Sequence, residues 1–177
     1  MADENLRFSN KSQICFASFT INRSEMRISM KIRPMVNKDL EQVCEIENDT
    51  FSEPWSYNSF SNSITSKDNT YLVAEEDGEI LGYCGMWGTV DEGQITNVAV
   101  KKEHRNKKIG FKLMKTLMEY GKDNGLIAFT LEVRAGNRAA INLYHNLGFT
   151  DSGYRKNFYS KPNEDALIMW LGDRNVC

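Results

Sequence analysis

The order in which strand-like and helical patterns alternate limits the possible folds of this chain most strongly. Strands are expected at 30–35, 71–74, 80–87, 94–100, 126–134, 149–155 and 166–171. Helices are expected after Asn37, over 57–64, over 109–124 and after Asn137. Such a mixed order predicts an α/β (α+β) domain with a partly antiparallel sheet and helices on its faces.

Local signals support these assignments. Asp77-Gly78 is a strong two-residue hairpin signal, and Gly125 and Gly148 stand where helices end. The expected apolar faces are Leu40, Val43, Cys44, Ile46 and Glu47 in the first helix, Ile109, Leu113, Met114, Leu117, Met118 and Tyr120 in the third, and Ile127, Phe129, Leu131 and Val133 in the strand after it.

The length of 177 residues fits one domain. We expect residues 30–172 to form it, with 1–29 as an extension outside the core and 173–177 as a tail. Acidic Asp3 and Glu4 argue against a signal peptide, and no apolar run reaches about 18 residues, so a cytoplasmic protein without a membrane span is expected. The net charge of −2 argues against nucleic acid as a partner.

Metal binding is not expected either. The four cysteines are scattered without a CxxC pair, and the two histidines cannot form a cluster of histidine ligands. Reduced thiols are the simplest account of the cysteines.

A short basic loop between the strand at 94–100 and the third helix is a candidate phosphate site. It reads Arg105-Asn106-Lys107-Lys108-Ile109-Gly110, and the start of a helix offers unpaired N–H groups and positive dipole to an anion. A solvated basic turn is an equally good account of this loop taken alone.

A carboxylate stands in the fifth strand, where Glu132 shares a face with the small residues Ala128 and Thr130. Such a group has room for a substrate or water from which it can accept a proton, and a tyrosine hydroxyl such as that of Tyr144 can donate one. Taken alone, Glu132 is more simply a surface residue and Tyr144 a core residue, and Asn137 is explained as a helix cap.

Val98-Ala99-Val100 followed by Arg105 and Gly110 resembles the acyl-CoA signature of the GCN5-related N-acetyltransferase (GNAT) family. The resemblance implies a mostly antiparallel sheet with acetyl-CoA in the splay between two central strands. It implies that Val98, Ala99 and Val100 hold the pantetheine arm and that Arg105, Asn106, Lys107, Lys108, Ile109, Gly110 and Phe111 hold the pyrophosphate. Lys108 replaces the first glycine of the signature, so its side chain either swings away or adds a charge to the site.

The segment LEVRxxNxxAxxLYxxxGF from Leu131 to Phe149 resembles the ribosomal-protein alanine N-acetyltransferase branch of that family, and the resemblance extends over residues 30–171. It implies Glu132 as general base, Tyr144 as general acid and Asn137 as a contact of the CoA arm. Trp55 is expected either to flank the acceptor peptide or to plug the space between helix and sheet. Asn157 and Tyr159 are expected either to line the peptide channel or to pack the C-terminal hairpin.

The resemblance therefore implies direct acetyl transfer, in a ternary complex, from acetyl-CoA to a protein N-terminus, namely the N-terminal alanine of small ribosomal subunit protein eighteen. We expect a monomer or a weak dimer. Acetylation of other N-termini, lysines or small amines is the alternative within the family, and a non-catalytic acetyl-CoA-binding domain is the alternative outside enzymes. Retention of both Glu132 and Tyr144 argues against the latter.

Overall fold

A computed structural model describes residues 30–172, so the expectations for 1–29 and 173–177 lie outside the described residues. The strands are β1 Lys31–Pro34, β2 Asn69–Glu76, β3 Glu79–Gly88, β4 Glu92–Val100, β5 Ala128–Arg134, β6 Thr150–Ser160 and β7 Asn163–Leu171. The helices are α1 Leu40–Thr50, α2 Tyr57–Ser63, α3 Ile109–Asp123 and α4 Arg138–Asn146, with 3-10 turns η1 Asn37–Asp39 and η2 Lys102–His104.

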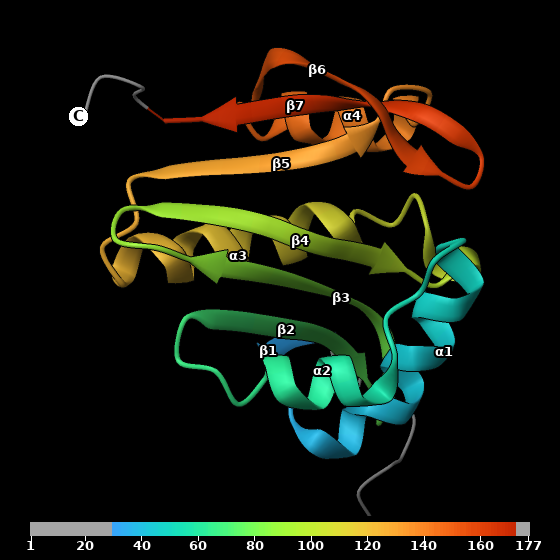
Figure 1. The fold of residues 1–177 in the computed structure, drawn as a ribbon. Helices are drawn as coiled ribbons and strands as arrows, with labels where there is room; N and C mark the ends of the chain where they lie inside the picture. The colour runs from blue at the N-terminus through green and yellow to red at the C-terminus, as the bar shows by residue number, and fades with distance from the viewer. Residues whose placement is uncertain (1–29, 173–177) are drawn as a thin grey trace, which may run out of the picture.

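The strands form one sheet in the order β1-β2-β3-β4-β5-β7-β6 (Figure 1). Every neighbouring pair is antiparallel except β4 and β5, which are parallel and connected through α3. The predicted mixed, mostly antiparallel sheet is therefore confirmed. Among residues 30–172, none of the helices combines the length and the apolar character that crossing a membrane requires.

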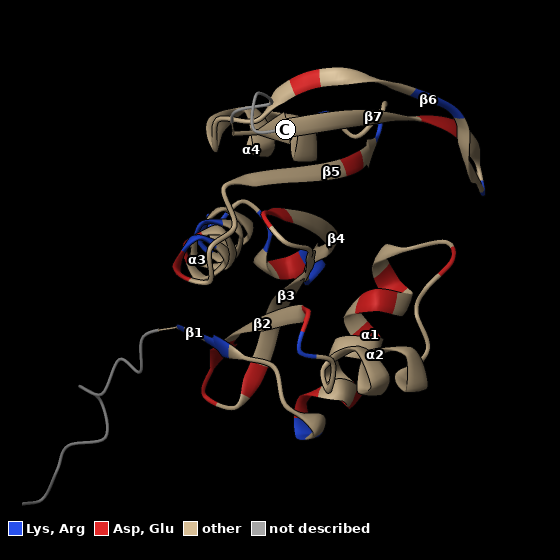
Figure 2. Ribbon diagram, turned by 60° about the vertical axis from the view of Figure 1, so that its left-hand side comes forward, with Lys and Arg blue, Asp and Glu red and all other residues tan. Residues whose placement is uncertain are grey.

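Two cores lie on the two faces of the sheet. The α1 core packs α1 and α2 against β2, β3 and β4 and is centred on Phe60 and Tyr83. The α3 core packs α3 and α4 against the opposite face and is centred on Leu113, Leu117 and Phe129. Figure 2 shows α1 and α2 on one side of β3 and α3 on the other.

The local signals for turns and caps are confirmed at three places. Asp77 and Gly78 turn between β2 and β3 with φ of 51° and 84°. Asn137 caps α4, because its side chain accepts a hydrogen bond from the Ala140 N–H at 3.2 Å. Gly148 has a φ of 93° just beyond the end of α4, in the left-handed region that favours glycine.

The expected role of Asn37 as the cap of α1 is wrong. Asn37 begins the 3-10 turn instead, and the carboxylate of Asp39 accepts a hydrogen bond from the Val36 N–H at 2.9 Å. The buried Asp39 is also held by the guanidinium of Arg33, which lies 2.6 Å from it and lowers its pKa. Arg33 thus ties β1 to the start of α1, a contact that no local pattern predicts.

Two residues assigned to buried faces are exposed. Tyr120 is 46% exposed because α3 meets the sheet through Gly121, where an added Cβ would lie 2.8 Å from Cε1 of Phe129. Ile127 is half-exposed because it precedes β5, and its N–H donates to the carbonyl of Asp91. Phe129, Leu131 and Val133 are buried as predicted.

Candidate active site

The predicted splay lies between β4 and β5. Their parallel pairing covers only four residue pairs, from Glu92 with Ala128 to Ile95 with Leu131. Beyond these pairs β4 stays with β3, while β5 stays with β7. Figure 1 shows the two strands diverging towards their carboxyl ends.

A bulge in β4 accompanies the divergence. Met86 pairs with Ile95 and Gly85 with Asn97, so Thr96 has no partner in the β3–β4 register. One extra residue bends a strand and moves the side chains that follow it to the opposite face. Ile95 accordingly packs in the α3 core, while Ala99 packs in the α1 core.

One cleft, here called the cofactor cleft, opens where β4 separates from β5. It has a volume of about 740 Å³ and lies between β4, the loop into α3, and α4. It is lined by every residue predicted to hold the cofactor except Lys107, namely Val98, Ala99, Val100, Arg105, Asn106, Lys108, Ile109, Gly110, Phe111 and Asn137.

The basic loop bends through two left-handed residues. Asn106 and Lys108 have φ of 62° and 61°, and α3 begins directly after Lys108. Lys108 thus adopts a backbone conformation that suits glycine best. The loop is also tied back to β4, because the Arg105 Nε donates to the Val100 carbonyl at 3.0 Å.

A second cleft, the acceptor cleft, lies on the other side of the splay and has a volume of about 590 Å³. Its walls are the α1–α2 segment, β4, β5 and the β6–β7 hairpin. The two clefts share part of their lining, namely Thr50, Val98, Asn137, Ala140 and Tyr144.

The two clefts differ in charge. Among the described residues no carboxylate lines the cofactor cleft, whereas His104, Arg105 and Lys108 do. The acceptor cleft is lined by three carboxylates, Glu47, Glu53 and Glu132, together with Arg134 and Lys161. Figure 2 shows the acidic bands of α1, the helix that borders this side. An anionic ligand is therefore favoured in the first cleft, and carboxylates for an ammonium group are available in the second.

Glu132 lines the acceptor cleft, with its side chain 20% exposed. Arg155 on β6 donates from Nη1 to its Oε1 at 2.6 Å, a contact that sequence reasoning did not anticipate. The carboxylate therefore reaches the cleft as one half of an ion pair, and an incoming ammonium group competes with Arg155 for it.

Tyr144 lies where the clefts join and is only 7% exposed. Its ring packs against Phe149 at 6.0 Å between centroids. Burial raises the pKa of its phenol above the usual value, so the hydroxyl stays protonated at neutral pH and is available as a donor.

Of the three residues predicted to contact the acceptor, two line the acceptor cleft and one does not. Trp55 lines the acceptor cleft and also packs on Phe60, with 5.5 Å between ring centroids. Tyr159 lines the cleft, and its hydroxyl donates to the Glu132 carbonyl at 3.3 Å. Asn157 lines neither cleft, and its N–H donates to the Asp165 carboxylate at 2.9 Å.

Sequence reasoning missed two buried polar residues in the acceptor cleft, Glu47 and Asn97. Glu47 is 1% exposed and accepts hydrogen bonds from the Trp55 N–H and the Tyr83 hydroxyl, so it fixes the α1–α2 segment. Burial raises the pKa of its carboxyl. Both residues stand at positions that the apolar spacing of their helix or strand assigns to a buried face. A polar side chain at such a position is the sequence signal that could have identified them.

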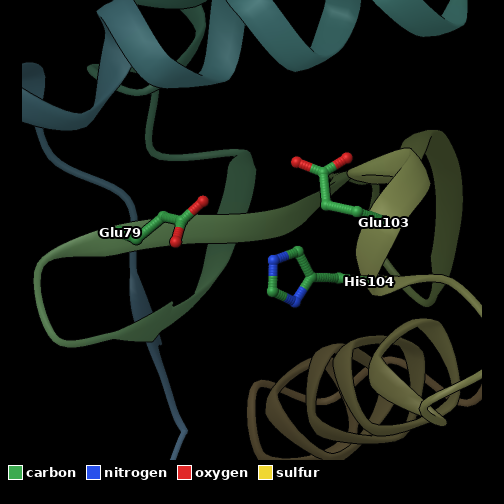
Figure 3. A group of neighbouring side chains, drawn as sticks. All are labelled: Glu79, Glu103 and His104. Atoms are coloured by element: carbon green, nitrogen blue, oxygen red, sulfur yellow. The ribbon is translucent and has the colours of Figure 1, made fainter.

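Glu79, Glu103 and His104 bring three potential metal-ligand atoms within 4.8 Å of one another (Figure 3). Both carboxylates belong to exposed residues, and the Lys101 ammonium lies 2.7 Å from Glu79. Glu79 and Glu103 line neither cleft, whereas His104 lines the cofactor cleft.

This chain is similar to known proteins over most of its length. Residues 40–149 match the model of the acetyltransferase (GNAT) family. A protein of Bacillus subtilis (strain 168), named as a candidate ribosomal protein bS18 alanine N-acetyltransferase, is 40% identical over 147 residues, which are 82% of this chain and 97% of that protein. The ribosomal protein bS18 alanine N-acetyltransferase of Escherichia coli (strain K12) is 30% identical over 142 residues, which are 79% and 95% of the two chains.

A solved structure agrees with the fold. The crystal structure of the ribosomal-protein-S18-alanine N-acetyltransferase from Escherichia coli superposes with a TM-score of 0.75 at 28% identity, covering 84% of this chain and 99% of that one. The family match spans the basic loop, Glu132 and Tyr144 together. The chain belongs to the GNAT acetyltransferase family.

Proposed function

We propose that this protein transfers the acetyl group of acetyl-CoA to the α-amine of a protein N-terminus, and that its acceptor is the N-terminal alanine of ribosomal protein bS18. The observation that carries the proposal is the meeting of the cofactor and acceptor clefts at Tyr144, with Glu132 on the acceptor side. The names of the two relatives supply the acceptor. Since ribosomal proteins are made in the cytoplasm, the proposal places the enzyme there.

The residues of the cofactor cleft fit acetyl-CoA. The basic loop and the first turn of α3 would hold the pyrophosphate, since the lining is cationic and free of carboxylates. β4 is not paired with β5 beyond Ile95, so the backbone of Val98 and the N–H of Val100, whose carbonyl accepts from Arg105, are available to the pantetheine arm. When bound, acetyl-CoA supplies an activated acetyl thioester.

Glu132 and Tyr144 divide the proton transfers. An N-terminal ammonium entering the acceptor cleft displaces Arg155 from Glu132, and the carboxylate then takes one proton, directly or through water. The neutral amine attacks the acetyl carbon, and the C–S bond breaks as Tyr144 donates its phenolic proton to the departing sulfur. The second proton, which the nitrogen sheds as it becomes an amide, passes through water to the tyrosinate and restores Tyr144. Direct transfer is expected because neither Cys44 nor Cys84, the two cysteines among residues 30–172, lines either cleft.

The hydrogen bonds that join two walls of the acceptor cleft favour a chain end over a side-chain amine as acceptor. The α1–α2 segment is bonded to the β6–β7 hairpin at two points, since Ser52 Oγ donates to the Lys161 carbonyl at 2.5 Å and Ser160 Oγ donates to Glu53 at 2.9 Å. Arg134 joins the same walls by donating to the Lys161 carbonyl at 2.9 Å. A single extended peptide can enter such a cleft with its N-terminal amine leading.

Mass spectrometry of peptides after incubation with acetyl-CoA tests the proposal. One peptide carries the N-terminus of bS18 with a free alanine, and its partner has the same sequence with a blocked N-terminus and one internal lysine. We expect acetylation of the first peptide only. Acetylation confined to lysine, or none on either peptide, would refute the proposed acceptor.

A further inference from the structure

Asn97 presents a hydrogen-bonding group that the folded chain leaves unused. The residue is 7% exposed, and its Oδ1 is the one buried side-chain nitrogen or oxygen among residues 30–172 that has no hydrogen-bond partner. Buried polar atoms are nearly always paired in folded proteins, because leaving one unpaired costs free energy. An unpaired atom of this kind in a cleft wall points to a ligand.

The β4 bulge determines which side Asn97 faces. After the unpaired Thr96, the side chains of Val98 and Val100 pack with the α3 core and that of Ala99 packs in the α1 core. Alternation along the strand places Asn97 with Ala99, and Asn97 lines the acceptor cleft rather than the cofactor cleft. Without the extra residue, Asn97 would face the α3 core like Ile95.

Asn97 stands opposite Glu132 across the splay. The last β4–β5 pair joins Ile95 to Leu131, so Asn97 lies two residues beyond it on one strand and Glu132 one residue beyond it on the other. Both line the acceptor cleft, and Tyr144 lines it from α4. The thioester end of the cofactor must come between these strands for the two clefts to exchange an acetyl group.

Two polar residues that line the same cleft as Asn97, Glu47 and Thr96, have partners within the fold. Glu47 accepts from the Trp55 N–H and from Tyr83, and the hydroxyls of Tyr71 and Thr96 lie 3.5 Å apart. The amide oxygen therefore remains for something that enters the cleft. What enters is an amine, whose N–H groups are donors both before and after it loses a proton.

We propose that the Asn97 Oδ1 accepts a hydrogen bond from the acceptor amine and, together with Glu132, aims its nitrogen at the acetyl carbon. This inference rests on the proposed function and adds a positioning residue to it. An amide oxygen is too weak a base to take the proton, so Glu132 keeps that role. The amine is thus held from β4 and β5 at once, which restricts its orientation as attack requires.

Asn97→Leu is the main test, because it removes the oxygen while keeping a similar side-chain volume. We expect kcat/KM for the bS18 peptide to fall at least tenfold, while the Kd for acetyl-CoA changes less than twofold. The melting temperature is expected to stay equal or rise, since an unpaired buried acceptor is gone. Asn97→Asp retains an oxygen at the same position and is expected to keep more activity than Asn97→Leu.

Asn97→Ala is measured in parallel in case the leucine variant fails to fold. It removes the amide without adding apolar bulk. Unchanged kcat/KM in a folded Leu or Ala variant would overturn the inference and assign the amide to a structural water. A parallel loss of acetyl-CoA affinity would overturn it too, by placing Asn97 on the cofactor side. If the wild-type enzyme fails to acetylate the peptide, the proposed function itself is refuted.

Discussion

Replacing Lys108 by glycine tests how the basic loop is built. Lys108 has a φ of 61° and a ψ of 15°, directly before α3. A left-handed conformation costs an L-residue roughly 1–2 kcal/mol, which glycine avoids. Glycine loses about 0.5–1 kcal/mol more than other residues through chain entropy on folding. The difference predicts that Lys108→Gly leaves the free energy of unfolding unchanged or raises it by up to about 1.5 kcal/mol.

The same change removes a charge from the lining of the cofactor cleft. A unit charge about 4 Å from another is worth about 1 kcal/mol when the dielectric is close to that of water, which corresponds to about fivefold in affinity. We therefore expect CoA to bind about fivefold more weakly at low salt, with a smaller loss at high salt because exposed charges are screened. Urea unfolding measures the first effect, and calorimetric titration with CoA at two salt concentrations measures the second.

Lys107→Gly is the matched control. It removes the same charge and adds the same chain entropy, but Lys107 is not among the residues with positive φ and does not line the cleft. It should destabilise the protein by about 0.5–1 kcal/mol and affect CoA binding less. If Lys108→Gly destabilises as much as Lys107→Gly, the strain argument is wrong. If CoA affinity is unchanged in Lys108→Gly, Lys108 is no phosphate ligand.

Three further predictions concern the acceptor side. Glu132→Gln should lower kcat by about 10²–10⁴-fold with the acetyl-CoA Kd unchanged. Arg155→Gln removes only the ion pair and should keep most of the activity, so equal losses of kcat in the two variants would show that Glu132 is not the base. Tyr144→Phe should lower kcat by about tenfold or more in steady-state assays, while the melting temperature stays close to wild type because the ring still packs on Phe149. Burial raises the pKa of Glu47 above its unfolded value, so the contribution of Glu47 to stability is greatest below the unfolded pKa of about 4.3 and is lost as pH rises through the folded pKa. The loss is about 1.4 kcal/mol for each pH unit that separates the two pKa values. Glu47→Gln should abolish this loss in urea titrations at pH 4 to 8, and an unchanged pH dependence would contradict the assignment.

The parts of the fold that depend on neighbours in the sequence were predictable. The Asp77-Gly78 turn, the Asn137 cap and the α3 stripe each follow from a short segment, because caps, turns and helical faces are made within a few residues. The residues expected to hold the cofactor came from the family resemblance rather than from local rules, and most of them belong to one strand, one loop and one helix start.

The polar contacts of the acceptor cleft were not predictable, because they join distant segments. Glu47 meets Tyr83 from another layer of the molecule, and Arg155 reaches Glu132 across β7. The side on which Asn97 lies depends on a bulge whose partner strand must be known first. Periodicity alone would place Asn97 beside Ile95 on the wrong face.

The short β4–β5 pairing also bears on self-association. By separating after four pairs, the two strands create two additional sheet edges, and an unpaired edge is a template on which a strand of another molecule can add. These inner edges face clefts walled by α1, α4 and the β6–β7 hairpin, so a foreign strand cannot reach them in register. Of the two outer edge strands, β1 is only four residues long and carries Lys31, Arg33 and Pro34, and β6 carries two register irregularities together with Arg155 and Lys156. Short length, charge, proline and bulges all discourage strand addition. The chain thus keeps open backbone for a ligand inside the molecule without offering it to aggregation.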